Sequence, residues 1–460
     1  MKKVPAIPNR LPLWLQWLTA GILGFIFVIL PFHAFLSTWG GTAIGPLEVW
    51  KSWKEVLLAA ATIPLLAWLC LRPRRLRALL SDRLSWWLLG FAGYMTILAL
   101  IHVDEIGQDA TLAGLAMNGR YLLAFVLSYI LFWYGTWTWE LIKTSALHYL
   151  IGMGVFVALL GIIQVTLLPN DFLTQFGYDK ETTIAPVTVI DDNPNAPRAF
   201  ATLRGPNDFG AFLILPIIAS LVAARKNPRL LIATVLLLVA LYFSSSRSAW
   251  LGVLVAAAIL AWLLVGKRLV RQKTFIIASL VALVVGAGLL AAAINISSIR
   301  LAVFHSSPSD TSLTEGSTDD HWTTTAGGIQ RVLSDPLGCG PGCSGPASYY
   351  GSSPKISENY YVQIAEETGI IGLVLWIGIV WTVGVRLWRQ RSDKLATALL
   401  ASLVGICVIG VWLHVWSDDP LSLTWWLLAG ATLGHFAQVL YSKQKHYDRQ
   451  TQKNTRQVRN

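Results

Sequence analysis

The side chains of this sequence best suited to chemistry are arginines in the polar segments between its apolar stretches. A guanidinium group presents a planar fork of N–H donors that matches phosphate oxygens. A charge at the edge of a membrane is costly unless it binds something, so such arginines are functional candidates by default. We therefore expect a site for a phosphate-bearing anion built from Arg198, Arg204, Arg247 and Arg331.

Each of the four arginines also has an alternative role that does not involve binding an anion. Arg247 lies in the Ser-rich turn FSSSRSAWLG between two apolar stretches. Its alternative role is a membrane anchor whose side chain reaches for the head groups. Arg198 fits either role equally well. For Arg204 and Arg331, an ordinary loop charge is the simpler interpretation.

The polar, glycine-studded stretch 319–372 supplies the candidate proton acceptors, Glu358 and His321. Histidine accepts a proton near neutral pH, and a glutamate does so where burial raises its pKa. Glu358 could instead compensate the positive end of a helix, and His321 could be a solvated loop residue. The sequence leaves the general base open between the two.

Composition places these residues in an integral membrane protein. The chain has 460 residues, 54% of them hydrophobic and 13% charged, with a mean hydropathy of +0.55. A spanning helix needs about 20 mostly apolar residues, because its backbone groups must bond within the segment. The sequence predicts an all-α polytopic transmembrane helix bundle of about 12 spans, near 13–36, 51–71, 85–102, 119–138, 146–168, 208–224, 229–245, 248–266, 274–295, 362–385, 395–416 and 421–441.

The placement of basic residues predicts the orientation of these spans, because loops rich in Lys and Arg stay cytoplasmic. With the N-terminus inside, the inner segments hold 26 of the 36 basic residues, and the outer ones hold 21 of the 25 acidic residues. Both termini are therefore expected in the cytoplasm. The net charge of +11 reflects this topology and attraction to anionic lipid, not nucleic-acid binding. Tryptophan clusters near span ends, including Trp416, Trp425 and Trp426, predict interfacial anchors.

The chain is expected to divide into N-terminal spans, a core with two long extracytoplasmic loops, C-terminal spans and a basic tail, at 1–168, 169–385 (loops 169–207 and 296–361), 386–441 and 442–460. In the first loop, Pro206 followed by Asn207 and Asp208 predicts a turn and helix cap. In the second loop, 320–334 has helical spacing and stops at Asp335-Pro336.

The cysteines and polar clusters give no metal site. Cys339 and Cys343 lie in the outer loop, where either a short disulfide or two free thiols would be compatible with the sequence. A zinc site would need more Cys or His ligands than this stretch supplies. We expect no metal and no cofactor.

Three segments together carry a family resemblance. RAFATLRGPNDFGAFL has an arginine followed by Pro-Asn at a helix start, here Arg198 with Pro206-Asn207. SSSRSAWLG contains Arg247, and DPLGCGPG precedes ENYYVQIAEETGIIGL, in which Glu358, Asn359 and Tyr360 open a helix. Over about 190–385 the chain resembles the O-antigen ligase and O-antigen polymerase superfamily of bacterial membrane proteins.

This resemblance implies a metal-independent, inverting glycosyltransferase of the bacterial cytoplasmic membrane. Its donor would be a glycan on undecaprenyl pyrophosphate in the outer leaflet, and its acceptor a glycan or lipid hydroxyl. By carry-over, Arg198 and Arg247 would bind the pyrophosphate, with Arg204 as an added contact. Ligases of this family commonly have His where this chain has Glu358, so the substitution favours a polymerase or polysaccharide enzyme.

Two other functions fit a chain of this size. A secondary transporter or lipid-glycan flippase also has about twelve spans, but transporters place charged sites at mid-membrane depth on repeated halves. Here the charged groups crowd one edge and no repeat is visible. A non-catalytic scaffold, whose large loop binds a partner, is the third possibility.

Overall fold

The computed structural model describes residues 10–71, 73–190, 193–269 and 317–457, without the side chains of 265–269, 317–322 and 443–457. Its N-terminal helices are α1 (Leu13–Ile29), η1 (Leu30–Phe32), α2 (His33–Ala43), α3 (Leu47–Cys70), α4 (Pro73–Leu80), α5 (Arg83–Ile106), α6 (Gln108–Tyr134) and α7 (Trp139–Thr166). The middle elements are η2 (Phe172–Phe176), β1 (Val189–Ile190), β2 (Asn193–Pro197), α8 (Pro206–Phe212), α9 (Ile214–Ala224), α10 (Leu230–Ser244) and α11 (Arg247–Leu269). The last are α14 (Ser317–Ser334), η3 (Gly345–Tyr350), α15 (Tyr360–Arg389), α16 (Lys394–Ile409) and α17 (Asp419–Gln457).

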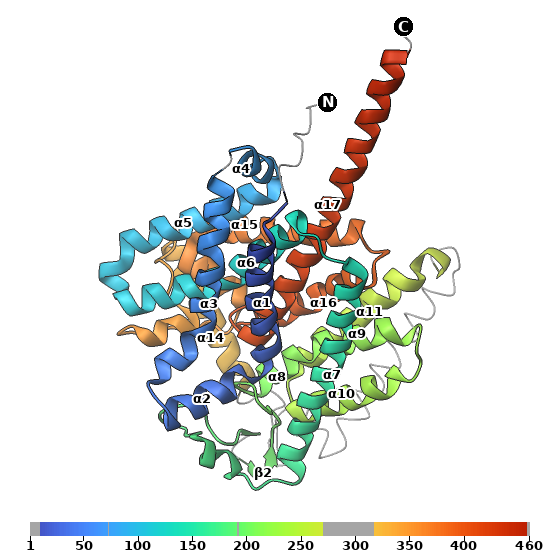
Figure 1. Cartoon of the computed structure of the whole chain (residues 1–460). Helices are drawn as coiled ribbons and strands as arrows, with labels where there is room; N and C mark the ends of the chain where they lie inside the picture. Colours follow the sequence, from blue (N-terminus) through green and yellow to red (C-terminus); the bar gives the residue numbers. More distant parts are fainter. Residues whose placement is uncertain (1–9, 72, 191–192, 270–316, 458–460) are drawn as a thin grey trace.

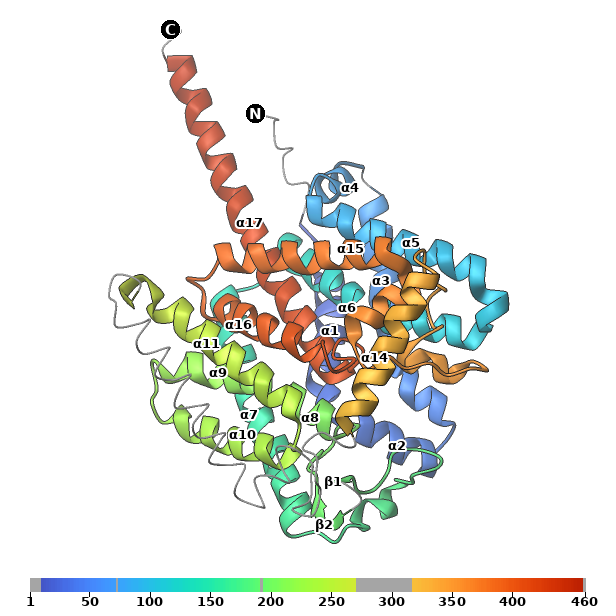
Figure 2. The same cartoon turned by 180° about the vertical axis from the view of Figure 1, so that it is seen from behind.

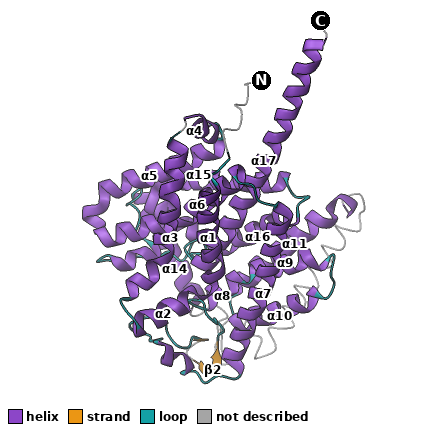
Figure 3. Ribbon diagram, viewed as in Figure 1, coloured by secondary structure: helices purple, strands orange, loops and turns teal. Residues whose placement is uncertain are grey.

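The predicted all-α membrane bundle is confirmed (Figure 3). Eight helical segments of the described part are long and apolar enough to cross a membrane, while α10 and α16 are apolar but shorter. The expected span 274–295 lies outside the described residues, so the count of twelve stays a prediction. The small antiparallel pair of β1 and β2 lies in loop 169–207. As predicted, a helix covers 320–334 and ends before Asp335.

Helices α6 and α17 pack along each other at the centre of the bundle, with α15 against α5 and α16 against α11 (Figures 1 and 2). Glycines on α17 permit the close approach to α6. A Cβ on Gly430 would lie 2.3 Å from the carbonyl oxygen of Phe125, and one on Gly434 would lie 2.3 Å from that of Tyr129. Glycines four residues apart are a common device for packing membrane helices backbone to backbone.

The start of α17 carries a buried aromatic core. Trp416, Trp425 and Trp426 are each 0% exposed, so the prediction that they are interfacial anchors was wrong. Their rings pack on one another, and Trp416 and Trp426 also contact Tyr121 of α6. They are buried because α17 starts inside the bundle. The hydroxyl of Tyr121 bonds to that of Tyr360 at 2.8 Å, which ties α15 to the same core.

Helix α15 is interrupted at Gly369, whose φ of 62° is left-handed. The Gly-rich loop 336–345 packs against this interruption and completes its hydrogen bonds. The amides of Cys339 and Gly340 donate to the carbonyls of Glu366 and Glu367 at 2.9 and 3.0 Å, and Ile370 donates to Pro336. The loop therefore replaces the helical bonds that the interruption breaks, and it covers the polar face of α15.

At the opposite end of α15, Arg386 forms an ion pair with Asp82, the residue that caps α5. Burial alone would raise the pKa of the Asp82 carboxyl, but the hydrogen bonds and charge of Arg386 hold that pKa below its usual range. This pair fixes α5 against α15.

The C-terminal end of α17 and strand β2 lie on opposite sides of the bundle. In Figure 1, α17 ends at the top, whereas β2 lies at the bottom. Segment 198–208 follows β2, and its residues 199–203 are buried.

Candidate functional site

Segment 198–208 is held by bonds to three parts of the bundle. The side-chain oxygen of Gln164, on α7, accepts hydrogen bonds from the backbone amides of Phe200 and Ala201 at 3.0 and 2.8 Å. Thr202 donates to the carbonyl of Pro31 at 2.6 Å. Ala199 donates its amide to Phe243 near the end of α10 at 2.9 Å. The segment is therefore a fixed part of the site and not a loose surface loop.

Arg198 clamps the turn between α10 and α11. Its Nε donates to the carbonyl of Ser244 at 3.0 Å, and its Nη2 donates to the side-chain oxygen of Asn207 at 2.9 Å. A longer contact of 3.4 Å reaches the carbonyl of Ser245. The capping prediction for Asn207 and Asp208 was wrong, because α8 starts at Pro206 and has no side-chain cap. Asn207 orients Arg198 instead.

Arg247 is the first residue of α11, directly after the Ser244–Ser246 turn that Arg198 holds. The two arginines that the sequence singled out for a phosphate are thus brought to one junction. The amide groups at the start of a long helix carry partial positive charge and attract anions. A half-buried Arg247 at this helix start and a half-buried Arg198 beside it place two guanidinium groups at one junction.

Backbone strain marks the same segments. Outside glycine, the described residues with left-handed backbone are Ala201, Ser245 and Glu358, with φ of 51°, 51° and 46°. Each lies in one of the three segments that carry the family resemblance. Such conformations cost about 1 kcal/mol or more for a residue with a side chain, and they cluster at functional sites. Ser245 in particular sets the direction in which α11 leaves the turn.

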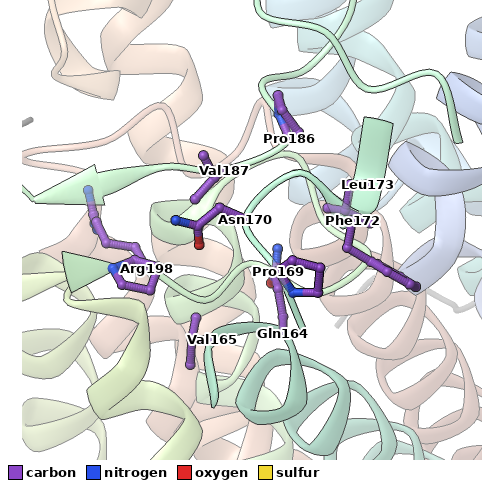
Figure 4. A pocket seen from close by; sticks show the side chains of 10 residues that line it. Gln164, Val165, Pro169, Asn170, Phe172, Leu173, Pro186, Val187 and Arg198 are labelled. Atoms are coloured by element: carbon purple, nitrogen blue, oxygen red, sulfur yellow. The ribbon is translucent and has the colours of Figure 1, made fainter. Parts of the chain in front are cut away.

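A small pocket lies beside Arg198, between the end of α7 and loop 169–207 (Figure 4). Figure 4 shows Arg198 on one side of it and Phe172 and Leu173 on the other. Its volume of about 10 Å³ is room for little more than one water. It cannot hold a diphosphate, so an anion at this junction would bind outside this pocket.

In the described part of the chain, Arg204 is not seen to bond to Arg198 or Arg247. Its side chain is exposed, and it interacts electrostatically with Asp208. Asp208 in turn lies close enough to Asp418 and Asp419 for their charges to interact. Segment 198–208 therefore links the arginine junction to the start of α17.

Around Asp419 the structure shows an ionic cluster that sequence analysis missed, formed by His33, Lys54, Glu55, Arg120 and Asp419. Asp419 pairs with Arg120, with Lys54 at 3.2 Å and with His33 at 3.3 Å. Arg120 also pairs with Glu55 at 2.8 Å. The side chains of Lys54 and Arg120 are only 3% and 8% exposed, so the cluster is buried. A signal was available, because Arg120 lies inside a predicted span and such a charge requires a partner.

Asp418, next to this cluster, differs from Asp419 in the environment of its carboxyl group. Burial raises the pKa of the Asp418 carboxyl well above its usual range, and the charges of Asp208 and Asp419 raise it further. The surroundings of Asp418 therefore favour its protonated form, while Asp419 faces two buried cations.

Arg331 bonds to a different part of the molecule from the junction of Arg198 and Arg247. Its Nε donates to Glu366, which is 2% exposed, in a salt bridge between α14 and α15. Glu366 also accepts from Ser344 at 2.7 Å and from Ser357. The polar face of α15 that carries Glu366 is thus buried against loop 336–345. Arg331 compensates a buried carboxylate.

Glu358 lies just before α15 and is half-buried. Its neighbour Asn359 caps the helix by accepting the amides of Tyr361 and Val362 at 3.0 and 3.1 Å. Tyr360 is buried in the aromatic core. His321 belongs to α14, but its side chain lies outside the described residues, so the structure gives no test of that candidate.

A buried polar chain runs from α6 through α15 to the loop before α17. Asn118 donates to Glu367 at 2.5 Å, and the side chain of Gln363 also bonds to Glu367. The amide oxygen of Gln363 faces Nδ1 of His414 at 2.9 Å. If the amide group of Gln363 donates to the carboxylate, its oxygen accepts, and Nδ1 of His414 carries the proton. This chain fixes the loop that leads to Asp418 and Asp419.

The sequence left open whether the two cysteines of the outer loop form a disulfide, and the structure shows that they do. Cys339 and Cys343 form a disulfide within the Gly-rich loop. Among the described residues, no three His, Cys, Asp or Glu side chains are placed to hold a metal ion. We assign no metal ligands.

Comparison with known families identifies one stretch of the chain. Residues 232–377 match the O-antigen ligase family. This part of the chain is an O-antigen ligase domain. No curated protein matches the chain. The match confirms the resemblance found in the sequence, and it indicates glycan transfer of the O-antigen ligase and polymerase type.

The O-antigen ligase domain contains Arg247, Arg331 and Glu358, together with α14, the disulfide loop and the first part of α15. Arg198 lies before the matched region. Its link to the site rests on geometry, since its guanidinium binds the turn that opens into Arg247.

Proposed function

We propose that this protein transfers a glycan from undecaprenyl pyrophosphate to an acceptor hydroxyl at the outer face of the bacterial cytoplasmic membrane, with inversion and without a metal. Its membrane helices and the O-antigen ligase domain support the substrate class. The observation that carries the proposal is the junction where Arg198 clamps the turn before Arg247.

The proposed step is one displacement at the anomeric carbon. The acceptor oxygen attacks this carbon while its bond to the pyrophosphate oxygen breaks, and the electron pair leaves with undecaprenyl pyrophosphate. Negative charge grows on the leaving group, so prearranged guanidinium and helix-end donors stabilise the transition state more than the bound donor. A base takes the proton of the acceptor hydroxyl.

An assay with purified protein tests this function. Given an undecaprenyl pyrophosphate-linked glycan and a glycan acceptor, we expect free undecaprenyl pyrophosphate and a product with inverted anomeric configuration. EDTA should leave the rate unchanged if no divalent metal takes part. A product that retains configuration, or activity that EDTA abolishes, would contradict the mechanism.

Transport of the lipid-linked glycan is the second candidate function. The ionic cluster favours it, because Arg120 lies within α6 and the charges are not confined to one edge. The O-antigen ligase domain favours transfer. A deletion strain separates the two, because a transporter's loss leaves unflipped precursor on the inner leaflet, whereas a transferase's loss leaves flipped precursor.

We expect Glu358 to be the base that activates the acceptor, and two replacements test this. Glu358→Gln removes the carboxylate and keeps the side-chain shape, so kcat should fall by about 100- to 10,000-fold. Glu358→Gly also removes the carboxylate but relieves the left-handed backbone. Both variants should therefore be inactive if the carboxylate takes the proton.

The outcome of the glycine variant decides between chemistry and backbone shape. An active Glu358→Gly protein would show that the residue serves only the turn before α15. In that case His321→Asn should be the variant that loses activity. The measurement is the initial rate of glycan transfer over a pH series, with membrane yield as the folding control.

A further inference from the structure

We propose that a polar cavity between α14 and α15 binds a hydroxyl-rich sugar ring of the acceptor. This inference rests on the proposed glycan transfer and adds the chemical class of ligand that a second subsite takes. The cavity has a volume of about 200 Å³ and is lined by charged side chains of both signs. These are Arg331 and Lys355 on one hand and Asp335 and Glu366 on the other.

An unsatisfied donor points to a ligand. Nη2 of Arg331 is buried and has no hydrogen-bond partner among the described residues, although Nε of the same group pairs with Glu366. A buried donor without an acceptor destabilises the structure, and more so when the group is charged. Arg331 lines the cavity, so a turn of its guanidinium group would bring Nη2 to an oxygen of a ligand there.

The charge balance favours a sugar over a phosphate. Two carboxylates line the cavity, and they would repel a dianion even beside Arg331 and Lys355. Sugar hydroxyls both donate and accept, so one ring can donate to a carboxylate and accept from a guanidinium or ammonium group. A few convergent polar groups of this kind are typical of small-molecule sites.

The walls of the cavity are formed in advance. The disulfide between Cys339 and Cys343 lies on one side, and the amide of Cys339 is bonded to the carbonyl of Glu366 at 2.9 Å. Ser344 holds the Glu366 carboxylate at 2.7 Å. These groups are already held in place, so ligand binding does not have to order them and loses less conformational entropy.

Saturation-transfer NMR on the full-length protein in lipid nanodiscs tests the site. The probes are free glucose, galactose, N-acetylglucosamine and rhamnose. We expect signal transfer to at least one of them. The double variant Asp335→Asn/Lys355→Gln should weaken that binding about ten-fold, since both side chains are exposed polar groups of the cavity wall.

The matched control is Lys180→Gln/Glu181→Gln, which removes one exposed charge of each sign in loop 169–207. It should leave sugar binding unchanged. Equal binding by the cavity variant and the wild type would overturn the proposal, as would the absence of binding by all four sugars.

The two proposals fail differently. If the sugar binds and the cavity variant weakens it, but no undecaprenyl pyrophosphate is released in the transfer assay, the subsite stands and the transferase function is wrong. If transfer occurs and the cavity variant changes neither sugar binding nor the KM for acceptor, the function stands and the subsite is wrong. A rise in acceptor KM with kcat unchanged supports the subsite, because that pattern marks lost ground-state binding.

Discussion

Replacing Arg247 by alanine is expected to reduce glycan transfer by about 100- to 1000-fold, the usual effect of removing one donor that stabilises charge in a transition state. Arg247 starts α11 beside the turn that Arg198 clamps, so its guanidinium and the helix end act on the same place. The fall should appear in kcat more than in KM for the donor, because the leaving-group charge develops during the reaction. Transfer by purified variants in nanodiscs is the measurement.

Two further variants make this result specific. Arg247→Lys keeps the positive charge but loses the planar fork, so it should recover only part of the lost rate. Arg225→Ala removes an exposed arginine at the far end of α9 and should transfer glycan normally. An Arg247→Ala protein that is extracted in normal amount and works at the wild-type rate would refute the role of this junction.

The membrane fold could be predicted because its determinants are local. Each spanning helix must satisfy its own backbone in lipid, so every span appears as one apolar run. Of the twelve expected spans, those outside 274–295 fall on helices that the structure describes. The turn that carries Arg247 was recognisable for the same reason, since serines and an arginine interrupt two apolar runs.

The interior of the site was harder to predict because its contacts join distant parts of the chain. Asn207 looked like a helix cap, yet its side chain accepts from Arg198. Glu366 and Gln363 are polar residues of a helix with no partner evident in the sequence, yet loop 336–345 and His414 cover them. A polar side chain before or on a helix has several possible partners, and only the tertiary packing selects one.

The ionic cluster around Asp419 is the clearest example of contacts between distant residues that the sequence does not predict. Lys54 on α3, Arg120 on α6 and Asp419 at the start of α17 have no shared pattern in the sequence. Each could be read alone as a span-edge charge. Their mutual neutralisation follows from the close packing of α6 and α17, which Gly430 and Gly434 permit.

Replacing Asp419 by asparagine should lower the free energy of unfolding by about 3–5 kcal/mol, because the buried cations Lys54 and Arg120 are then left with only the carboxylate of Glu55 between them. Asp419 is the shared partner of Lys54, Arg120 and His33. The measurement is the unfolding temperature of protein purified in one detergent. The matched control is Glu140→Gln, which removes another acid paired with a lysine. Glu140 is 77% exposed and its partner Lys143 keeps Asp393, so the unfolding temperature should barely move.

A double variant separates lost charge balance from lost packing. Adding Arg120→Gln to Asp419→Asn removes one charge of each sign, so the stranded cation disappears and part of the stability should return. Glu55, which pairs with Arg120, keeps Lys54 as a partner at 3.2 Å in that double variant. A double variant no more stable than Asp419→Asn would show that Asp419 acts through shape or hydrogen bonding alone. Recovery of stability without recovery of glycan transfer would instead place the cluster's charges in the reaction as well as in the fold.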